Sequence, residues 1–320
     1  MRVVFFGTPR TAVPSLDALL DAGHEVPLVV TRPDRPVGRG RRSTAQPVRV
    51  RAGERGLASV QPSGIRDDAF LATLRAAAPE ILVVVAYGRI LSGSLLEAAL
   101  RGAVNLHFSL LPAYRGAAPV QWAIANGETH TGVSTMRMNE RMDEGGILLQ
   151  SVVEIGTDEH APALAERLAA VGAGLLIETL ARLGKGDLVD SAQDSTRATF
   201  ARRLVSADGW IDPALPARSI EGRIRGFDPW PGAWVGCRGR RLRLVAGRAL
   251  SGSARSDVPG TILGFDPDAI RVACGGASIL AVDSVQPEGG RVLAARDAVN
   301  GRYVALGDHF ERLERADRSA

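Results

Sequence analysis

Apolar and polar residues follow two patterns along the first part of the chain. Short apolar runs rich in β-branched residues predict buried strands, and apolar positions three and four residues apart predict helices. The expected strands span residues 2–6, 26–30, 81–86, 103–107, 133–138 and 147–155. The expected helices span residues 13–22, 67–77, 95–100 and 161–183. Because a helix between two strands usually joins them in parallel, this order predicts an α/β fold with a mostly parallel sheet and an antiparallel return at its end.

The pattern changes after residue 183. Residues 184–199 are polar and irregular, as is typical of a linker. One helix is expected near residues 216–224, followed by short strands at 233–237, 241–245, 260–263, 270–273 and 278–282. Short strands at this spacing predict a small β-barrel, of which the OB type is one common form. We therefore divide the chain into a first domain at 1–184, a linker at 185–204 and a second domain at 205–320.

Length and composition fit a globular protein with room for two domains. The chain has 320 residues, of which 45% are apolar and 23% charged. No stretch approaches the roughly 20 apolar residues that a membrane helix needs, and the apolar run near the N-terminus is too short for a signal peptide. We expect a soluble, cytoplasmic protein. In that setting Cys237 and Cys274 are expected to be buried thiols, and neither has neighbours at the spacing of a metal site.

The positive charge is concentrated in one segment. Residues 32–55 hold eight arginines against two acidic residues, a net charge of +6, so the rest of the chain carries −2 of the overall +4. Lys185 is the only lysine, and arginine suits phosphate because its planar guanidinium can bind two oxygens at once. The segment predicts a contact with a polyanion. A solvated, charged surface loop is the alternative.

Three polar residues form the most informative set. Asn105 and His107 end a buried strand, where α/β sheets place their ligands, and strand alternation puts them on one side. An amide can stabilise a developing oxyanion while the imidazole moves the proton. Asp143 precedes two glycines in a turn, where its carboxylate could orient the histidine. Each residue taken alone is more often structural, as a hydrogen-bonding histidine or as a turn residue, so only the set indicates chemistry.

The order of these motifs resembles that of the folate-dependent formyltransferases. Asn105-Leu106-His107-Phe108-Ser109-Leu110-Leu111-Pro112 is followed by Tyr114-Arg115-Gly116 and, some thirty residues on, by Met142-Asp143-Glu144-Gly145. The resemblance implies a Rossmann-like formyltransferase domain in which Asn105, His107 and Asp143 are the catalytic trio. The sequence departs from the family at Phe108, Tyr114 and Arg141, which bear on the shape of the pocket.

The same resemblance implies a folate co-substrate, 10-formyltetrahydrofolate, and no metal. Residues at two places match the family's folate-binding segments. The first place is the Ser-Leu-Leu-Pro stretch, and the second is the end of the strand at 81–86 together with the turn after it. The residues implied are Ser109, Leu110, Leu111, Pro112, Val85, Tyr87 and Gly88.

Within the family, the chain is most similar to members that formylate initiator methionyl-tRNA. The similarity lies in Gly7-Thr8-Pro9, in the arginine-rich residues 31–42 and in residues 224–234, which match the entry to an OB-like C-terminal domain. It implies tRNA contacts by Arg35, Arg39, Arg41 and Arg42. Nothing in the sequence demands an oligomer, so we expect a monomer.

Three other functions stay open at this point. The amine could belong to a sugar nucleotide or to a purine-pathway intermediate, although the latter enzymes would lack the barrel and the arginine-rich segment. A hydrolase could pass the formyl group to water, which would leave the arginines unexplained. A non-catalytic RNA-binding protein could use the arginines and the barrel, but it would not need Asn105, His107 and Asp143 together.

Overall fold

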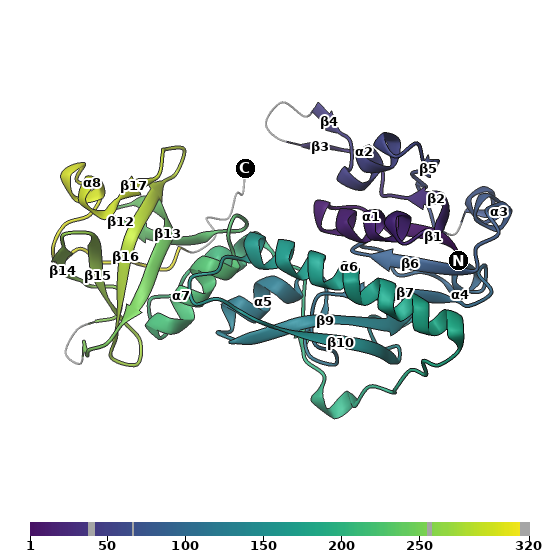
Figure 1. The fold of residues 1–320 in the computed structure, drawn as a ribbon. Coiled ribbons are helices and arrows are strands. Elements are labelled where there is room, and N and C mark those ends of the chain that lie inside the picture. Colours follow the sequence, from purple (N-terminus) through teal and green to yellow (C-terminus); the bar gives the residue numbers. More distant parts are fainter. Residues whose placement is uncertain (38–41, 66, 255–257, 314–320) are drawn as a thin grey trace. The chain divides into compact units, whose positions relative to one another are not determined.

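The computed structural model describes residues 1–37, 42–65, 67–254 and 258–313. The chain folds into two compact units (Figure 1). Unit 1 contains residues 1–119, 130–154 and 165–202, and unit 2 contains residues 120–129, 155–164 and the described residues from 203 on. No helix in these described ranges is long and apolar enough to cross a membrane.

Unit 1 is built on one twisted sheet. Its strands are β1 (Arg2–Gly7), β2 (Glu25–Val30), β5 (Ser59–Val60), β6 (Ile81–Val85), β7 (Ala103–His107), β9 (His130–Arg137) and β10 (Ile147–Glu154). They lie in the order β10-β9-β7-β6-β1-β2-β5. The pairs from β7 to β5 are parallel, and β9 and β10 return antiparallel. The predicted mostly parallel α/β sheet is confirmed.

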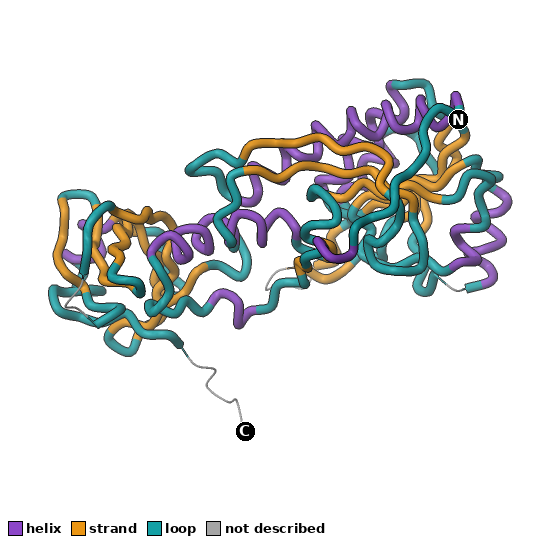
Figure 2. The backbone as a smooth tube through the Cα atoms, turned by 90° about the horizontal axis from the view of Figure 1, so that it is seen from below, coloured by secondary structure: helices purple, strands orange, loops and turns teal. Residues whose placement is uncertain are grey.

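Helices cover both faces of this sheet, which is why its central strands are apolar throughout. The helices are α1 (Val13–Asp21), α2 (Pro47–Glu54), α3 (Asp68–Ala76), α4 (Gly93–Leu96) and α6 (Ala161–Lys185). Phe6 and Val84 pack with Phe70 of α3 on one face. On the other face α6 approaches β7 closely, because a Cβ on Gly172 would lie 2.8 Å from Leu106. Figure 2 shows the strands of this unit side by side with helices next to them.

Three helical features differ from the sequence prediction. The helix expected at 95–100 is the single turn α4, because Leu95 is buried but Leu100 is 90% exposed and has no apolar surface to cover. The sequence pattern missed α2 and the seven-residue α5 (Pro119–Ala125). In α2 only Val48 and Ala52 are buried, too few positions to produce a helical apolar stripe.

Unit 2 holds an antiparallel barrel. Its strands are β12 (Ala233–Cys237), β13 (Arg240–Leu250), β14 (Ile262–Asp266), β15 (Ala269–Cys274), β16 (Ser278–Pro287) and β17 (Leu293–Ala294). Five of them lie in the order β12-β13-β16-β15-β14, and β17 pairs with β16. The helices α7 (Ala217–Gly226) and α8 (Ala295–Asn300) belong to the same unit. The architecture agrees with the expected OB-like domain.

A segment near the C-terminus closes this barrel. Glu311 bridges to Gly236 on the edge strand β12, and His309 bridges to Thr261 beside the opposite edge strand β14. The ring of Phe310 lies in the core at 2% exposure, among residues that include Val235 and Val272. Pairing both edges in this way removes the exposed strand edges that an open sheet would leave.

Both cysteines are free and buried in the barrel. Cys237 is fully buried, and Cys274 is 3% exposed. Burial raises the pKa of each thiol to about 11, so neither carries a nucleophilic thiolate at neutral pH.

Closure of the barrel predicts a stability difference between two glycine variants. Gly260 has φ +102°, and a Cβ there would lie 2.2 Å from the Phe310 carbonyl oxygen. Gly260→Ala should therefore lower the free energy of unfolding by roughly 2–4 kcal/mol. Gly239→Ala is the control, with φ +70° but no atom within 4 Å of the added methyl, and it should cost about 1 kcal/mol.

Urea unfolding followed by tryptophan fluorescence measures this difference in unit 2, because Trp122, Trp210, Trp230 and Trp234 all belong to that unit. Equal losses in the two variants would show that the contact between Gly260 and the closing segment does not hold the barrel.

Candidate active site

The strand β7 presents Asn105 and His107 on the same face of the sheet. Both are nearly buried, at 8% and 6% exposure. Asn105 lies opposite Val84 of the parallel strand β6, and His107 lies opposite Ser134 of β9. The side chains therefore emerge where the parallel strands end, as the alternation along the sequence predicted.

The ring of His107 is held from both sides. Its Nε2 lies 3.0 Å from the carbonyl oxygen of Tyr114. Because a carbonyl only accepts, Nε2 carries the hydrogen in this bond. The other nitrogen, Nδ1, lies 3.7 Å from Oδ2 of Asp143. The neutral ring thus keeps the Nδ1 lone pair for a proton, and the carboxylate would stabilise the charge that the ring gains on taking one.

Backbone constraints bring Asp143 to this position. Its φ of +54° is unusual for a residue with a side chain, and its Oδ2 accepts a hydrogen bond of 2.9 Å from the Gly116 amide. Gly145 has no room for a side chain, because a Cβ would lie 1.7 Å from the Arg137 carbonyl oxygen. The glycine after the acidic pair is therefore required by close packing of the turn, which presents the aspartate toward β7.

Asn105 differs from the other two members of the set. Among the described residues, its side-chain amide has no hydrogen-bond partner. Asn105 lines a cavity, so this amide is open to a ligand. The amide can therefore donate to an oxygen that arrives with a substrate.

A cavity of about 500 Å³ joins these three side chains. Its wall combines the strand ends, the loop after β6 and the turn around Asp143. The lining residues are Pro9, Val84, Ala86, Tyr87, Gly88, Arg89, Ile90, Asn105, Leu106, His107, Phe108, Gly116, Ala117, Pro119, Met136, Met138, Asn139, Arg141, Met142 and Asp143. An amide donor, an imidazole and a carboxylate in a largely apolar cavity can perform acyl transfer through a tetrahedral oxyanion.

The cavity contains part of the sequence-predicted folate set. Tyr87 and Gly88 line it, as do Phe108 and Arg141, two of the residues that depart from the family pattern. Burial raises the pKa of the Tyr87 phenol, and within the described residues its hydroxyl has no hydrogen-bond partner.

Ser109, Leu110, Leu111, Pro112 and Val85 do not line the cavity. Hydrogen bonds hold the stretch from Ser109 to Pro112 in place. The Ser109 hydroxyl donates to the Ala113 carbonyl at 2.6 Å, and the Ser134 hydroxyl donates to the Ser109 carbonyl at 2.6 Å. These bonds shape the loop that carries the Tyr114 carbonyl to His107. A folate contact by these residues stays a prediction.

Two residues missed by the sequence analysis complete the site. Arg115 is 3% exposed, and Gln193 joins it to the turn at Asp143. Arg115 stands beside Gly116 in a motif that the sequence did show. Gln193 lies in the segment expected to be a linker, and no local signal marks it.

The arginine-rich segment forms a hairpin at its described ends. The strands β3 (Arg35–Val37) and β4 (Arg42–Thr44) pair antiparallel. Of the four predicted tRNA-binding residues, Arg35 and Arg42 lie on these strands, and Arg39 and Arg41 lie outside the described residues. Asp34 anchors the base of the hairpin through Arg49, at 2.6 Å. A contact of these arginines with tRNA stays a prediction.

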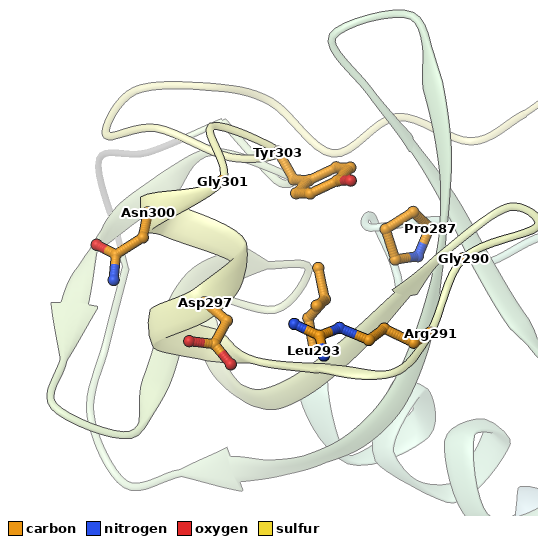
Figure 3. Close-up of a pocket in the computed structure, with 8 residues that line it drawn as sticks. All are labelled: Pro287, Gly290, Arg291, Leu293, Asp297, Asn300, Gly301 and Tyr303. Carbon is orange, nitrogen blue, oxygen red and sulfur yellow. The ribbon is translucent and has the colours of Figure 1, made fainter.

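A second cavity, of about 350 Å³, lies in unit 2 (Figure 3). Its lining includes Arg291, Asp297, Asn300 and Tyr303. It offers no imidazole or thiol as base or nucleophile, and so the cavity at β7 is the candidate active site. Within the described ranges, no group of three or more His, Cys, Asp or Glu side chains is arranged to hold a metal.

Comparisons with protein families agree with this geometry. Residues 1–180 match the formyl transferase family, and residues 203–303 match the formyl transferase C-terminal domain. The chain belongs to the formyl transferase family.

Similar proteins fall within the same family. The chain is 47% identical over 302 residues to the methionyl-tRNA formyltransferase of Anaeromyxobacter dehalogenans, covering 94% of this chain and 97% of that one. It is 44% identical to the methionyl-tRNA formyltransferase of Myxococcus xanthus, covering 96% of both. The fold is similar to that of an N-formyltransferase from Helicobacter canadensis, crystallised with folinic acid and dTDP-3-aminofucose. That structure has a TM-score of 0.67 and 16% identity, covering 88% of this chain and 99% of the other.

The contacts of the histidine rings predict opposite tautomers for two residues. Neutral His107 should carry its hydrogen on Nε2, because Nε2 donates to the Tyr114 carbonyl. His160 is a matched control, since its Nδ1 lies 3.0 Å from a carboxylate oxygen of Asp228 and should carry the hydrogen. Long-range proton–nitrogen NMR spectra, assigned with His107→Gln and His160→Gln, measure both. A hydrogen on Nδ1 of His107 would contradict this arrangement of the site.

Proposed function

We propose that this chain transfers the formyl group of 10-formyltetrahydrofolate to the α-amino group of initiator methionyl-tRNA. The observation that carries the proposal is the partnerless Asn105 amide beside the His107–Asp143 pair in the cavity of a formyl transferase fold. Relatives named methionyl-tRNA formyltransferase, 40–47% identical and alignable over nearly the full chain, support the choice of substrate.

The geometry supports a mechanism in which each member of the trio has one role. The α-amine attacks the formyl carbon, so that a carbon–nitrogen bond forms and the carbonyl oxygen becomes an oxyanion. Asn105 donates to that oxygen, and His107 takes the proton from the amine at Nδ1. The bond to N10 of the folate then breaks, and His107 returns the proton to N10. Asp143 stabilises the charged ring between these two transfers.

The folate would lie against the loop after β6, where Tyr87 and Gly88 line the cavity. The arginine-rich hairpin would bind tRNA phosphates, because it belongs to residues 32–55, which carry a net charge of +6 while the rest of the chain carries −2. The enzyme would act as a cytoplasmic monomer, with the OB-like unit as a further nucleic-acid surface.

A sugar-nucleotide amine is the alternative substrate that the fold alone leaves open, since one protein of similar fold was crystallised with such a sugar. One assay separates the two functions. The protein is given labelled 10-formyltetrahydrofolate with charged initiator tRNA, with uncharged tRNA and with amino sugars linked to dTDP. Label on the charged tRNA only is the expected result, and label on a sugar would overturn the proposal.

Removal of the oxyanion donor or of the base should abolish most turnover. Asn105→Ala should lower kcat by on the order of 10²–10³ because the oxyanion loses a hydrogen bond. His107→Ala should lower it by on the order of 10²–10⁴. The control is His130→Ala, at an exposed end of β9. Single-turnover formylation measures the rates, and filter binding should show unchanged affinity for tRNA. Near-normal turnover in either variant would refute the assigned roles.

The hairpin should set the salt dependence of tRNA binding. The double variant Arg35→Ala/Arg42→Ala should bind more weakly, and the slope of log affinity against log salt should fall by about 1–2, as two phosphate contacts are lost. Arg39→Ala tests the segment between the strands in the same way.

Arg55→Ala is the control for the hairpin, because Arg55 comes from the same basic segment but pairs with Asp17 at 2.8 Å. Affinity measured by filter binding between low and moderate salt gives the slopes. A double variant with the slope of the unaltered protein would place the hairpin arginines in solvent.

A further inference from the structure

The turn at Asp143 needs support that its own residues do not supply. Asp143 has φ +54°, a conformation that costs a residue with a Cβ free energy and persists only where its surroundings enforce it. Its carboxylate is held through Gly116. Further contacts hold the backbone of the turn, and in one of them the Arg137 amide donates to the Gly146 carbonyl at 2.8 Å.

Gln193 holds that backbone. Its side-chain amide nitrogen donates to the Asp143 carbonyl at 2.8 Å and to the Gly145 carbonyl at 2.7 Å. One amide group therefore uses both of its hydrogens on the two carbonyls of a single turn. These bonds fix the turn on either side of Glu144.

The other end of the same amide is bound to a buried cation. The Gln193 side-chain oxygen accepts from Nε of Arg115 at 3.0 Å and from Nη2 at 2.8 Å. Arginine only donates and carbonyls only accept, so just one orientation of the Gln193 amide satisfies all four contacts. Arg115 directly precedes Gly116, whose amide binds the Asp143 carboxylate. The hydrogen bonds thus form a closed ring around the turn.

The segment that carries Gln193 is itself fixed to unit 1. On one side, Ser191 and Ile147 exchange two backbone hydrogen bonds of 2.8 and 2.9 Å. On the other, β11 (Phe200–Ala201) pairs in parallel with β8 (Arg115–Gly116). Gln193 therefore reaches the turn from a segment anchored before and after it.

We propose that Gln193 is a positioning residue for the reaction, which acts by holding Asp143 against His107. The inference rests on the proposed function only for its kinetic test. Gln193 neither lines the cavity nor touches His107, so it must act through the groups that it binds, the turn at Asp143 and Arg115.

Two substitutions test the oxygen and the nitrogen of the Gln193 side-chain amide separately. Gln193→Glu keeps an oxygen for Arg115 but cannot donate to the carbonyls of the turn, and Gln193→Ala removes both ends. Each should lower kcat by on the order of 10²-fold, because a small displacement of a catalytic group costs that much, while KM for either substrate changes little. Asp194→Ala is the matched control: it removes the cap bond to Thr196 in the same segment without touching the turn, and it should retain full turnover.

A double-mutant cycle with Asp143→Asn distinguishes positioning from a general structural role. If Gln193 acts through Asp143, then Gln193→Glu should cost little further rate once the carboxylate is gone. Additive losses in the double variant would overturn the proposal.

The NMR signals of the His107 ring nitrogens give a test without substrate. They should move in Gln193→Ala and in Asp143→Asn, but not in Asp194→Ala. Unchanged signals in Gln193→Ala would contradict the inference even if formyl transfer to tRNA were shown. An unaltered protein that does not formylate methionyl-tRNA would refute the proposed function instead, and the NMR result would still decide the role of Gln193.

Discussion

The placement of one carboxylate beside one buried imidazole is the constraint on which the rest of the site depends. Asp143 lies 3.7 Å from His107 only because its turn adopts a left-handed backbone conformation. That conformation requires Gly145, which packs against the Arg137 carbonyl, and the hydrogen bond from Gly116 to the carboxylate. Three segments that are distant in the sequence therefore hold the single contact between Asp143 and His107. The conformational cost of the turn is recovered by hydrogen bonds that no isolated peptide could form.

The polar residues of the site differ in whether the protein supplies their hydrogen-bond partners. The hydroxyls of Ser109 and Ser134 both donate to carbonyl oxygens of the protein, and these bonds shape the loop. The Tyr87 hydroxyl is buried and lacks a partner among the described residues, and the Asn105 amide faces the cavity without one. Since a buried polar group without a partner is destabilising, the free energy lost there is available for binding a substrate. The hydrogen-bond donors available to a substrate are therefore those that the fold leaves without a partner.

The cavity and the basic segment of unit 1 both carry charge. Arg89, Arg141 and Asp143 are among the residues that line the cavity. The described strands β3 and β4 of the arginine-rich segment form a hairpin, and Arg49, Arg51 and Arg55, which follow in the sequence, pair with Asp34 and Asp17.

The sequence alone predicted six strands of the sheet, β1, β2, β6, β7, β9 and β10, the face shared by Asn105 and His107, and the small barrel, because apolar periodicity and glycine content are local properties. It could not determine α2, whose buried stripe is two residues, or the role of the polar segment around Gln193. It also could not show that the Ser109 hydroxyl and carbonyl are hydrogen-bonded within the protein. Those features depend on contacts between residues tens of positions apart, and hydrogen bonds such as that between Gln193 and Asp143 leave no periodic trace along the chain. Only the tertiary structure decided how the carboxylate meets the imidazole.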